Sequence, residues 1–478
     1  MLNHSSARNL DPSSGPKCSI SVAAPAPLPR AASVMVFLVL GILYLACSPG
    51  EVLAEEARFQ WGTRVTLSET YDDNIDLDKN HKKSDWITTV GPGVTLSVET
   101  EKTKAQLDYD VYYSFYARHP DDNSLSHALS LTGFKGIPVA EHFTLDLDEN
   151  LTISEDPIQA NTTSVQRSRE TYYSNTAGGR LNYLFGPQDS LYVGFKHTYY
   201  DSTDSSVQGG YGYGPTAGMS YWFTVRQGIS LDFSLWNGRF DHTEDTEGSD
   251  DFDEYRGSAT YTYRFDPRTT ANLSYTYDRF DYQNPGPGVV QLSGNGQNSE
   301  NVNRQDYVVH SGSLGLSHDF TEHFSASISG GWWYQVREDG SNAQGPNGSV
   351  SLTQKLEKGS LNLSAATGYN QQFFQAENLG LSQYSRVTAS LSYQLRERLT
   401  GTLAAFYDRE KYKETVPTRT DDTWGASAGL SYLVYTWLSA GLDYSYRQMD
   451  STLANEEYTD NRVTFTLTAF YLSTPKSF

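Results

Sequence analysis

Segments of about ten residues that alternate apolar and polar side chains run through this chain from Phe59 to Tyr471. Residues 104–116 are an example. Their apolar set is Ala105, Leu107, Tyr109, Val111, Tyr113 and Phe115, and their polar set is Gln106, Asp108, Asp110, Tyr112 and Ser114. A period of two is that of a β-strand, because successive side chains point to opposite faces. The sequence therefore predicts many strands, each with one apolar face and one hydrated face.

The connections between these segments alternate in length. The short ones are expected at Glu101–Thr103, Gly186–Asp189, Thr224–Gln227, Asp266–Thr269, Thr321–His323, Glu357–Gly359, Arg396–Arg398 and Val434–Thr436, and longer polar ones lie between them. Bacterial outer-membrane barrels have short periplasmic turns and long external loops. We therefore predict a single all-β transmembrane antiparallel up-and-down barrel of about 20 strands (18–22), with both ends on the periplasmic side.

The composition is compatible with such a barrel. The net charge of −21 argues against a nucleic-acid partner, which needs a basic surface. The mean hydropathy is negative, as expected when only every second residue of a strand faces lipid. The 34 Tyr and 8 Trp residues suit the aromatic girdles of the two membrane interfaces. An aromatic-rich soluble β-protein is the alternative, but it would not explain the regular alternation of loop lengths.

The first part of the chain reads as a secretion signal. Residues 31–46 are the only long apolar run; Arg30 precedes them, and cleavage is expected near Ala54. We thus divide the chain into an N-terminal extension with signal peptide (1–54) and a barrel (55–478). A lipoprotein cleavage box ending at Cys47 is a weaker alternative. Because the only cysteines lie at or before Cys47, the barrel has no disulfide, cysteine nucleophile or thiolate metal site.

The polar faces of the strands supply the candidate lumen residues, which would line a substrate path. They are Asp108, Asp110, Tyr112, Asp146, Asp148, Trp236, Arg256, Arg264, Trp333 and Arg337. A barrel of this size encloses water unless loops plug it. The tryptophans could stack on sugar faces, or they could pack against inward loops or lie at the rim. The arginines would favour anionic solutes and the aspartates would oppose them, so the charge selectivity stays open.

Two local features carry further expectations. Gly91-Pro92-Gly93 interrupts the second predicted strand, and proline removes a ladder donor, so a bulge or kink is expected there. The connection Tyr282–Asp306 is rich in Gly, Asn and Gln. It could bind a ligand outside the cell, or fold inward and narrow the pore.

Three short motifs resemble those of a known family. They are Ser68–Ile75 at the end of the first strand, Asp85–Gly93 in the second, and Asp460–Val463 at the start of the last. Together they resemble the Putative beta-barrel porin 2 family. Its members are outer-membrane barrels, many from polysaccharide-biosynthesis loci that also encode exosortase systems. The resemblance implies an outer-membrane location and no catalytic residues.

The chain also resembles, more loosely, barrels that pass secreted polysaccharides through the outer membrane. Such exporters often carry a periplasmic helical-repeat domain, whereas here the first strand begins close to the predicted cleavage site. A periplasmic export channel would then be a separate protein. The last strand ends in Tyr471, which is similar to the aromatic signal that the outer-membrane assembly machinery reads; Phe478 lies beyond Pro475.

Alternative chemistry has little support in the sequence. Asp250, Asp251 and Asp253 belong to an acidic run, Asp241–Glu254, that could bind a divalent cation but also suits a solvated loop. The histidines form no catalytic constellation, so we expect neither an enzyme nor a cofactor. No plug domain precedes the barrel, which argues against a TonB-dependent receptor.

The sequence therefore predicts a channel for a hydrophilic solute or polymer, surrounded by outer-membrane lipid and lipopolysaccharide. Exopolysaccharide export is the sharper expectation and rests mainly on the resemblance. A general or selective diffusion porin is the alternative, and a non-conducting structural or adhesive barrel is a third reading.

Overall fold

The computed structural model describes residues 58–99, 104–156, 169–204, 207–241, 250–291, 299–375, 377–453 and 456–477. The predicted signal peptide and its cleavage point, both cysteines, the turn at 101–103, most of the acidic run and Phe478 lie outside these residues. No helix among the described residues is long and apolar enough to span a membrane.

Twenty strands form one closed antiparallel barrel, which confirms the predicted fold class and strand number. Its first half comprises β1 (Arg58–Asp72), β2 (Asp85–Glu99), β3 (Lys104–Tyr116), β4 (Ser124–Ala140), β5 (Phe143–Ser154), β6 (Tyr172–Leu184), β7 (Ser190–Ser202), β8 (Gly210–Thr224), β9 (Gln227–Phe240), β10 (Phe252–Asp266) and β11 (Thr269–Tyr282). Its second half comprises β14 (Tyr307–Asp319), β15 (Phe324–Arg337), β16 (Ala343–Leu356), β17 (Gly359–Gln372), β18 (Gly380–Arg396), β19 (Leu399–Tyr412), β20 (Thr420–Tyr435), β21 (Leu438–Ser451) and β22 (Tyr458–Leu472).

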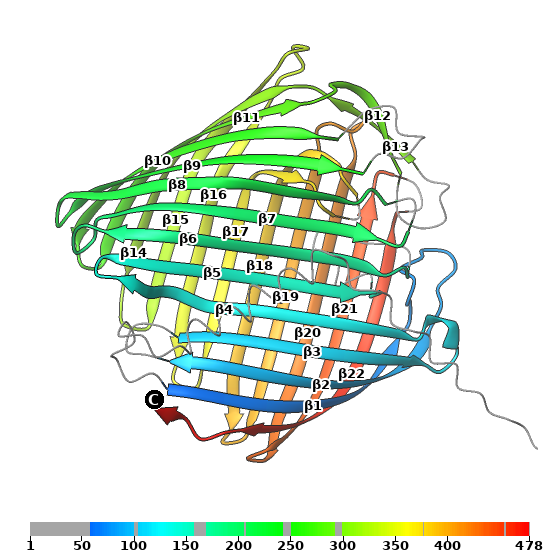
Figure 1. Cartoon of the computed structure of the whole chain (residues 1–478). Coiled ribbons are helices and arrows are strands. Elements are labelled where there is room, and N and C mark those ends of the chain that lie inside the picture. Colours follow the sequence, from blue (N-terminus) through cyan, green and yellow to red (C-terminus); the bar gives the residue numbers. More distant parts are fainter. Residues whose placement is uncertain are drawn as a thin grey trace, which may run out of the picture. The chain divides into compact units, whose positions relative to one another are not determined.

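Three short elements lie outside the barrel wall or at its ends. They are the 3-10 helix η1 (Pro120–Asp122), the hairpin of β12 (Gly286–Gln291) and β13 (Ser299–Arg304), and the two-residue β23 (Lys476–Ser477), which pairs with β1. In Figure 1 the C-terminal end lies beside the start of β1, and the β12–β13 hairpin lies at the opposite end of the barrel. The length rule for loops assigns the first end to the periplasm and the second to the cell exterior.

The barrel closes where the first strand pairs with the last. β1 and β22 pair without a register shift from Gly62↔Leu472 to Asp72↔Arg462, and β1 pairs with β2 on its other side. Closure leaves no unpaired strand edge in the wall, which is what lets a sheet cross a bilayer.

The outward face of the wall is apolar and exposed. Val193, Leu273 and Leu314 expose 61%, 58% and 63% of their surface, and similar side chains occur on nearly every strand. Such a continuous apolar surface would be unstable in water but is the surface that lipid requires. The alternation read from the sequence thus separates the lipid face from the lumen face.

Two details differ from the sequence-based expectation. Several strands begin earlier at their external ends than the apolar pattern indicated, for example β8 at Gly210 and β16 at Ala343, because backbone pairing continues beyond the lipid, where no apolar face is needed. No bulge occurs at Gly91-Pro92-Gly93, because β2 keeps one register with β1 and with β3 on either side of it, but the β2–β3 pairing is interrupted at Gly91 and Pro92, where proline offers no donor. Register shifts occur instead in β4, between Leu131 and Ala140, and beside the short turns at the ends of β8, β10, β18 and β20.

The presence of Gly91 and Gly93 in β2 is explained by side-chain packing rather than by a bulge. A Cβ atom on Gly91 would lie 2.4 Å from the ring of Tyr112, and one on Gly93 would lie 2.0 Å from Asp110 Oδ1. Side chains of β3 therefore lie flat across the lumen face of β2, and only glycine leaves room for them.

Candidate pore and external lid

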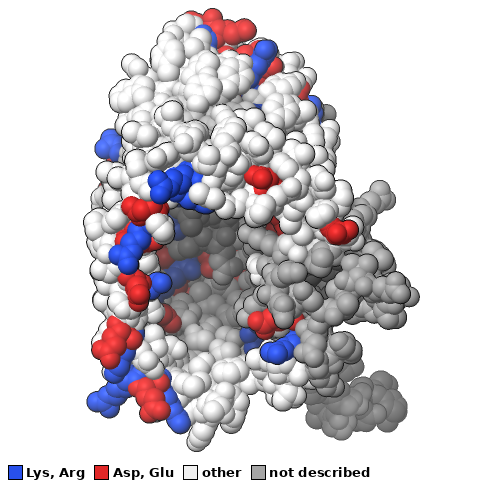
Figure 2. Space-filling model, turned by 90° about the vertical axis from the view of Figure 1, so that its left-hand side faces the viewer, with Lys and Arg blue, Asp and Glu red and all other residues white. Residues whose placement is uncertain are grey.

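The lumen is open on the side of the short turns. Figure 2 shows a deep hollow on that side of the molecule, with basic and acidic side chains on its rim and inside it. One pair on the wall illustrates the lining. Arg64 of β1 donates from Nε to Asp110 Oδ1 at 2.7 Å and from Nη1 to Asp108 Oδ1 at 3.2 Å, and its Nη2 also contacts Asp110. Because basic and acidic groups pair along the wall, the lining is polar without a strong excess of either sign here.

A loop between β17 and β18 enters the lumen at the other end. Its Phe373 lies 4.8 Å from the ring of Phe252 and 5.5 Å from that of Phe280, and its Phe374 lies 4.9 Å from Phe240. These partners are on β9, β10 and β11, several strands away around the ring. The rest of this aromatic cluster consists of Tyr282, Tyr307, Val309, Trp333 and Leu381.

The same loop reaches almost the opposite wall. Phe374 also packs against the buried cluster of Tyr172, Tyr200 and Val207, which lies on β6 and β7 and just after them. Eight barrel strands, β7–β11 and β14–β16, separate β6 from β17 on one side, and ten separate β17 from β6 on the other. The described residues of this loop, 373–375 and 377–379, therefore lie across the external mouth.

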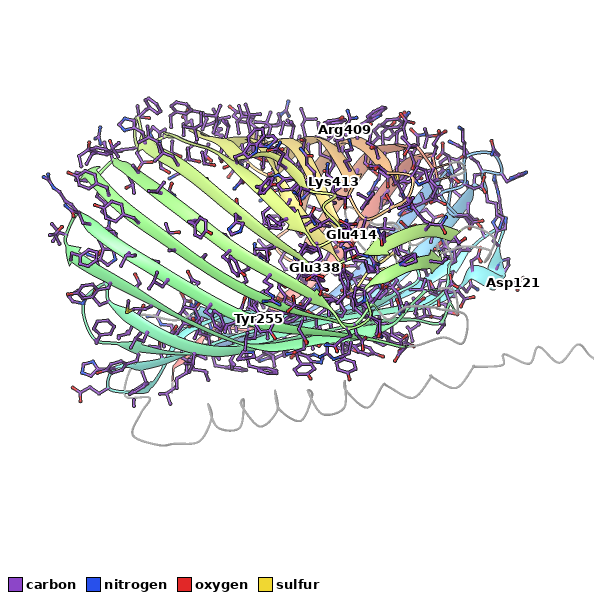
Figure 3. The ribbon with its side chains drawn as sticks, turned by 90° about the horizontal axis from the view of Figure 1, so that it is seen from above. Asp121, Tyr255, Glu338, Arg409, Lys413 and Glu414 are labelled. Atoms are coloured by element: carbon purple, nitrogen blue, oxygen red, sulfur yellow. The ribbon has the colours of Figure 1, made fainter. Side chains whose placement is uncertain are left out.

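The β12–β13 hairpin and segment 413–419 complete the covering. Val302 and Thr415 form an isolated bridge, Asn303 N–H donates to the carbonyl oxygen of Glu414 at 2.8 Å, and Val416 N–H donates to that of Asn301 at 2.8 Å. In Figure 3, Lys413 and Glu414 are drawn between the wall that carries Arg409 and the wall that carries Tyr255. We call the described residues of three segments together the external lid: 286–291 with 299–304, 373–375 with 377–379, and 413–419.

Arg304 of β13 joins these lid segments to the barrel wall. Its Nε donates to Asp250 Oδ1 at 2.8 Å, its Nη1 donates to Glu414 Oε2 at 2.9 Å, and its Nη2 donates to the carbonyl oxygen of Asn378. Tyr282 O–H donates to the same Glu414 oxygen at 2.9 Å. The arginine side chain is only 3% exposed, so each of its partners is held in a dry environment.

Arg419 makes a second buried junction. Its Nε donates to Asp421 Oδ1 at 3.0 Å, and its Nη1 lies 3.2 Å from Glu300 Oε2 and 3.0 Å from Glu377 Oε2. These partners come from β20, from the hairpin and from the inward loop, so one guanidinium connects three separate chain segments. Burial raises the pKa of Glu300, and Arg419 offsets this only in part.

This raised pKa predicts how the lid responds to acid. With the lid open, Glu300 would be hydrated and would titrate near 4.5, so the closed lid binds the proton more tightly. The contribution of Glu300 to the stability of the closed lid is complete below pH 4.5, and it is lost as the pH rises through the raised pKa. Lowering the pH from about 7.5 to about 5 should therefore reduce single-channel conductance in a planar bilayer, and Glu300→Gln should remove most of this change. A conductance that rises in acid would contradict this prediction. Asp421 and Glu456 also face Glu300, and both stay unaltered in the Glu300→Gln variant.

The predicted lumen residues fall into two groups. Asp108, Asp110 and Tyr112 lie on the lumen wall formed by β2 and β3, and Asp146 pairs with Arg180 Nη2 at 2.6 Å. Asp148 lies against Gly178, whose Cβ position is 2.7 Å from Asp148 Oδ1. Arg256 is 3.8 Å from Glu254, and Arg264 lies over the ring of Trp222 at 3.7 Å and donates to Gln188.

The remaining three lie at the lid. Trp236 packs against Phe374, and Trp333 is fully buried with its ring 5.8 Å from that of Tyr369. Arg337 donates from Nη2 to the carbonyl oxygen of Asn303 in the hairpin at 2.8 Å. In this arrangement both tryptophans are packed under the inward loop.

The three candidate cation ligands all have protein donors. Asp250 pairs with Arg304, Asp251 accepts the backbone N–H of Phe240 at 2.8 Å, and Asp253 pairs with Arg239 at 2.8 Å. The described residues of the connection Tyr282–Asp306, 282–291 and 299–306, form the β12–β13 hairpin, and its contacts with Thr415 and Glu414 give it the inward one of its two expected arrangements. Sequence reasoning missed Arg304, Arg419, Phe373 and Phe374. The adjacent phenylalanines in an otherwise polar external loop were the available signal.

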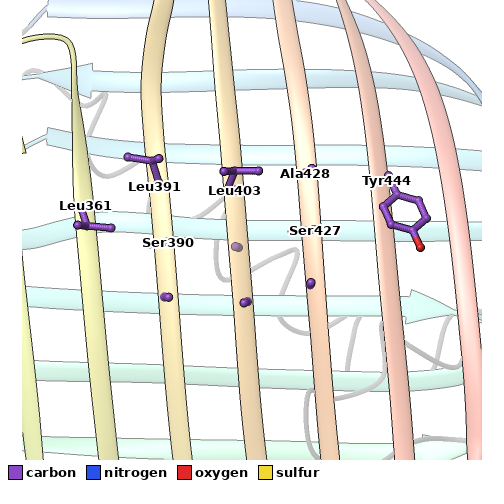
Figure 4. Close-up of a pocket in the computed structure, with 11 residues that line it drawn as sticks. Leu361, Ser390, Leu391, Leu403, Ser427, Ala428 and Tyr444 are labelled. Atoms are coloured by element: carbon purple, nitrogen blue, oxygen red, sulfur yellow. The ribbon is translucent and has the colours of Figure 1, made fainter.

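The outer wall also carries one apolar depression. It lies on β17–β21 and is lined by small side chains between larger ones, among them Leu361, Leu391, Leu403, Ala428 and Tyr444 (Figure 4). These residues belong to the lipid-facing belt, so lipid chains are expected to cover them.

Residues 251–471, from the start of β10 into β22, match the model of the Putative beta-barrel porin 2 family. This match confirms the resemblance that the short motifs indicated, and it identifies a porin-like barrel of the outer membrane. A porin-like fold points to a channel rather than to an enzyme. No curated protein sequence matches the chain.

Solved structures with a similar arrangement of strands share little sequence with it. The siderophore receptor PirA from Pseudomonas aeruginosa is 10% identical over 86% of this chain and 80% of that chain, with a TM-score of 0.46. OccAB4 from Acinetobacter baumannii is 10% identical over 88% and 100% (TM-score 0.37), and a BenF-like porin from Pseudomonas fluorescens Pf-5 is 12% identical over 88% and 99% (TM-score 0.35). At these sequence identities and TM-scores, the similarities do not indicate a function for this chain.

Proposed function

We propose that this porin-like barrel, matched over residues 251–471 by the Putative beta-barrel porin 2 family, exports a hydrophilic polymer, most simply a polysaccharide, through its lumen. The observation that carries the proposal is the asymmetry of the lumen, which is hollow on the side of the short turns and covered by the external lid at the other end. A chain that enters from the periplasm meets a hydrated wall first and the lid last, so the covering would open outward.

The chemistry of the lumen supports a sugar polymer as the substrate class. The wall offers paired charges such as Arg64 with Asp110, which can exchange hydrogen bonds with hydroxyl groups without holding a charged ligand tightly. Trp236 and Trp333 would become available for stacking on sugar rings once the inward loop moves away. A separate periplasmic export protein and the outer-membrane assembly machinery remain the expected partners.

A diffusion porin for small solutes is the second candidate. In it, the external lid would act as a fixed constriction with a narrow passage beside it, and the mixed charges of the wall would give weak selectivity. The two candidates differ in whether the lid must move for transport.

The decisive test compares a strain that lacks the protein with its parent. The export proposal predicts that surface polysaccharide falls to a small fraction of the parental amount and that polymer accumulates in the periplasm, while the uptake of small hydrophilic solutes stays normal. Complementation with the intact chain serves as the control. Normal surface polymer together with slower solute uptake would overturn the export proposal and favour the diffusion porin.

A further inference from the structure

The short motifs at the two ends of the barrel sequence meet in space at the closing seam. Asn461 of β22 donates from its backbone N–H to Asp73 Oδ1 and from Nδ2 to Asp73 Oδ2, both at 2.8 Å. Asn74 donates from Nδ2 to the carbonyl oxygen of Thr459, also at 2.8 Å. These contacts bind the end of the first strand to the start of the last, on the external side of the barrel.

Three carboxylates gather at this point. One oxygen from each of Asp72, Asp73 and Asp460 lies within 4.8 Å of the other two, a spacing that a single ion can bridge. Asp72 and Asp460 are 1% and 2% exposed. The Asp73 side chain is 27% exposed, which leaves a path from solvent to the group.

The nearby basic groups do not balance these charges. Arg462 Nε lies 2.9 Å from Asp72 Oδ2 and 3.0 Å from Asp460 Oδ2, but its Nη1 is also paired with a fourth carboxylate, Asp156, at 3.1 Å. Lys82 Nζ is 3.9 Å from Asp73. Among the described residues, Arg462 and Lys82 are the basic side chains that contact Asp72, Asp73 and Asp460, and Arg462 also contacts Asp156. Buried carboxylates without full compensation are costly.

One oxygen of the cluster has no donor. Asp72 Oδ1 accepts the backbone N–H of Asn74 at 2.7 Å, and both oxygens of Asp73 accept hydrogen bonds from Asn461. Asp460 Oδ1 is buried and has no hydrogen-bond partner among the described residues. An ionised oxygen in this position requires a positive charge, and the exposed side of Asp73 is where a small ion can enter.

We propose that Asp72, Asp73 and Asp460 bind one divalent cation, Ca²⁺, that ties the first strand of the barrel to the last. Ca²⁺ fits better than Mg²⁺ because it accepts irregular sets of oxygen ligands, whereas Mg²⁺ demands near-octahedral geometry and keeps its waters. The site lies on the external side, where the ion is supplied by the medium. Its role is to stabilise closure of the barrel, and it does not depend on what the lumen carries.

The test uses the full chain, refolded in a zwitterionic detergent, treated with EDTA and freed of it. Titration with CaCl₂ alone in a calorimeter should show one site per chain, with a Kd of about 10⁻⁴–10⁻³ M, the range of extracellular calcium modules. The temperature at which the folded barrel loses its fast mobility on unheated gels should rise with Ca²⁺.

Two variants and one control separate this site from others. Asp460→Asn should weaken Ca²⁺ binding at least tenfold, and Asp73→Asn, which changes the more exposed ligand, keeps the test valid if the first variant does not fold. Asp281→Asn is the control, because Asp281 is a carboxylate at the external end of β11 whose side chain is 29% exposed, similar to that of Asp73, and which pairs with Arg279. It should bind Ca²⁺ like the parent.

Failure of the parent chain to bind Ca²⁺ would overturn the proposal, as would equal binding by Asp460→Asn and the parent. A melting temperature that responds to pH but not to Ca²⁺ would also overturn it, since it would mean that Asp72 and Asp460 share a proton instead of an ion.

Discussion

Replacing Arg304 by alanine is expected to open the external lid and raise the single-channel conductance of the barrel. The substitution leaves Asp250 and Glu414 in a buried place without their cation. Removing one partner of a buried ion pair costs about 3–5 kcal/mol. Since about 1.4 kcal/mol is a factor of ten, the ratio of open to closed lid should rise roughly 10²- to 10⁴-fold.

The measurement is conductance in planar bilayers, with Arg279→Ala as the matched control. Arg279 also pairs with a carboxylate, Asp281, but its side chain is 54% exposed, and such surface pairs contribute little. The control should conduct like the parent. Equal conductance of the Arg304 variant and the parent would show that the lid does not restrict the passage of ions.

Replacing Arg462 by alanine is expected to impair barrel closure. Arg462 is the basic group shared by Asp72, Asp460 and Asp156, and its loss leaves three carboxylates close together at the seam. A cost of about 3–5 kcal/mol is again the expected scale, because the pairs are mostly buried. The folded fraction and the denaturant midpoint should both fall, as measured by gel mobility without heating and by guanidinium titration.

Arg409→Ala controls for the loss of an arginine from the external end of a strand. Arg409 lies 3.8 Å from Asp422 on the outer wall and is 55% exposed. Its removal should leave the midpoint close to that of the parent. Normal stability of the Arg462 variant would mean that the backbone pairing of β1 with β22 is sufficient to close the barrel.

Much of the fold could be predicted because lipid and water impose a period of two. Leu107 and Asp108 had to face opposite media, and the same argument applied from strand to strand until twenty were counted. The external ends, such as Gly210 on β8 and Ala343 on β16, could not be placed this way. There both faces meet water or loops, and only backbone pairing defines the strand.

The candidate site was less predictable because it depends on contacts between distant segments. The polar face of β3 identified Asp108 and Asp110 as lumen residues, but their partner Arg64 lies two strands away and no local pattern selects it. The lid joins Asp250, Arg304 and Glu414, which are separated by long stretches of chain. The alternation of apolar and polar residues placed Trp236 and Trp333 on the inner face, but it could not show that they lie under the loop that carries Phe374.

The crossing of Phe374 to Tyr172 and Tyr200 also has a mechanical consequence. A wide ring of strands bends easily, since its cross-section can flatten into an ellipse without breaking a single backbone hydrogen bond. The loop that carries Phe373 and Phe374 connects nearly opposite parts of the wall, and it therefore resists that deformation. While Phe373 and Phe374 pack as described, the width of the wall along this axis is fixed, and removal of these contacts would make the wall more compliant.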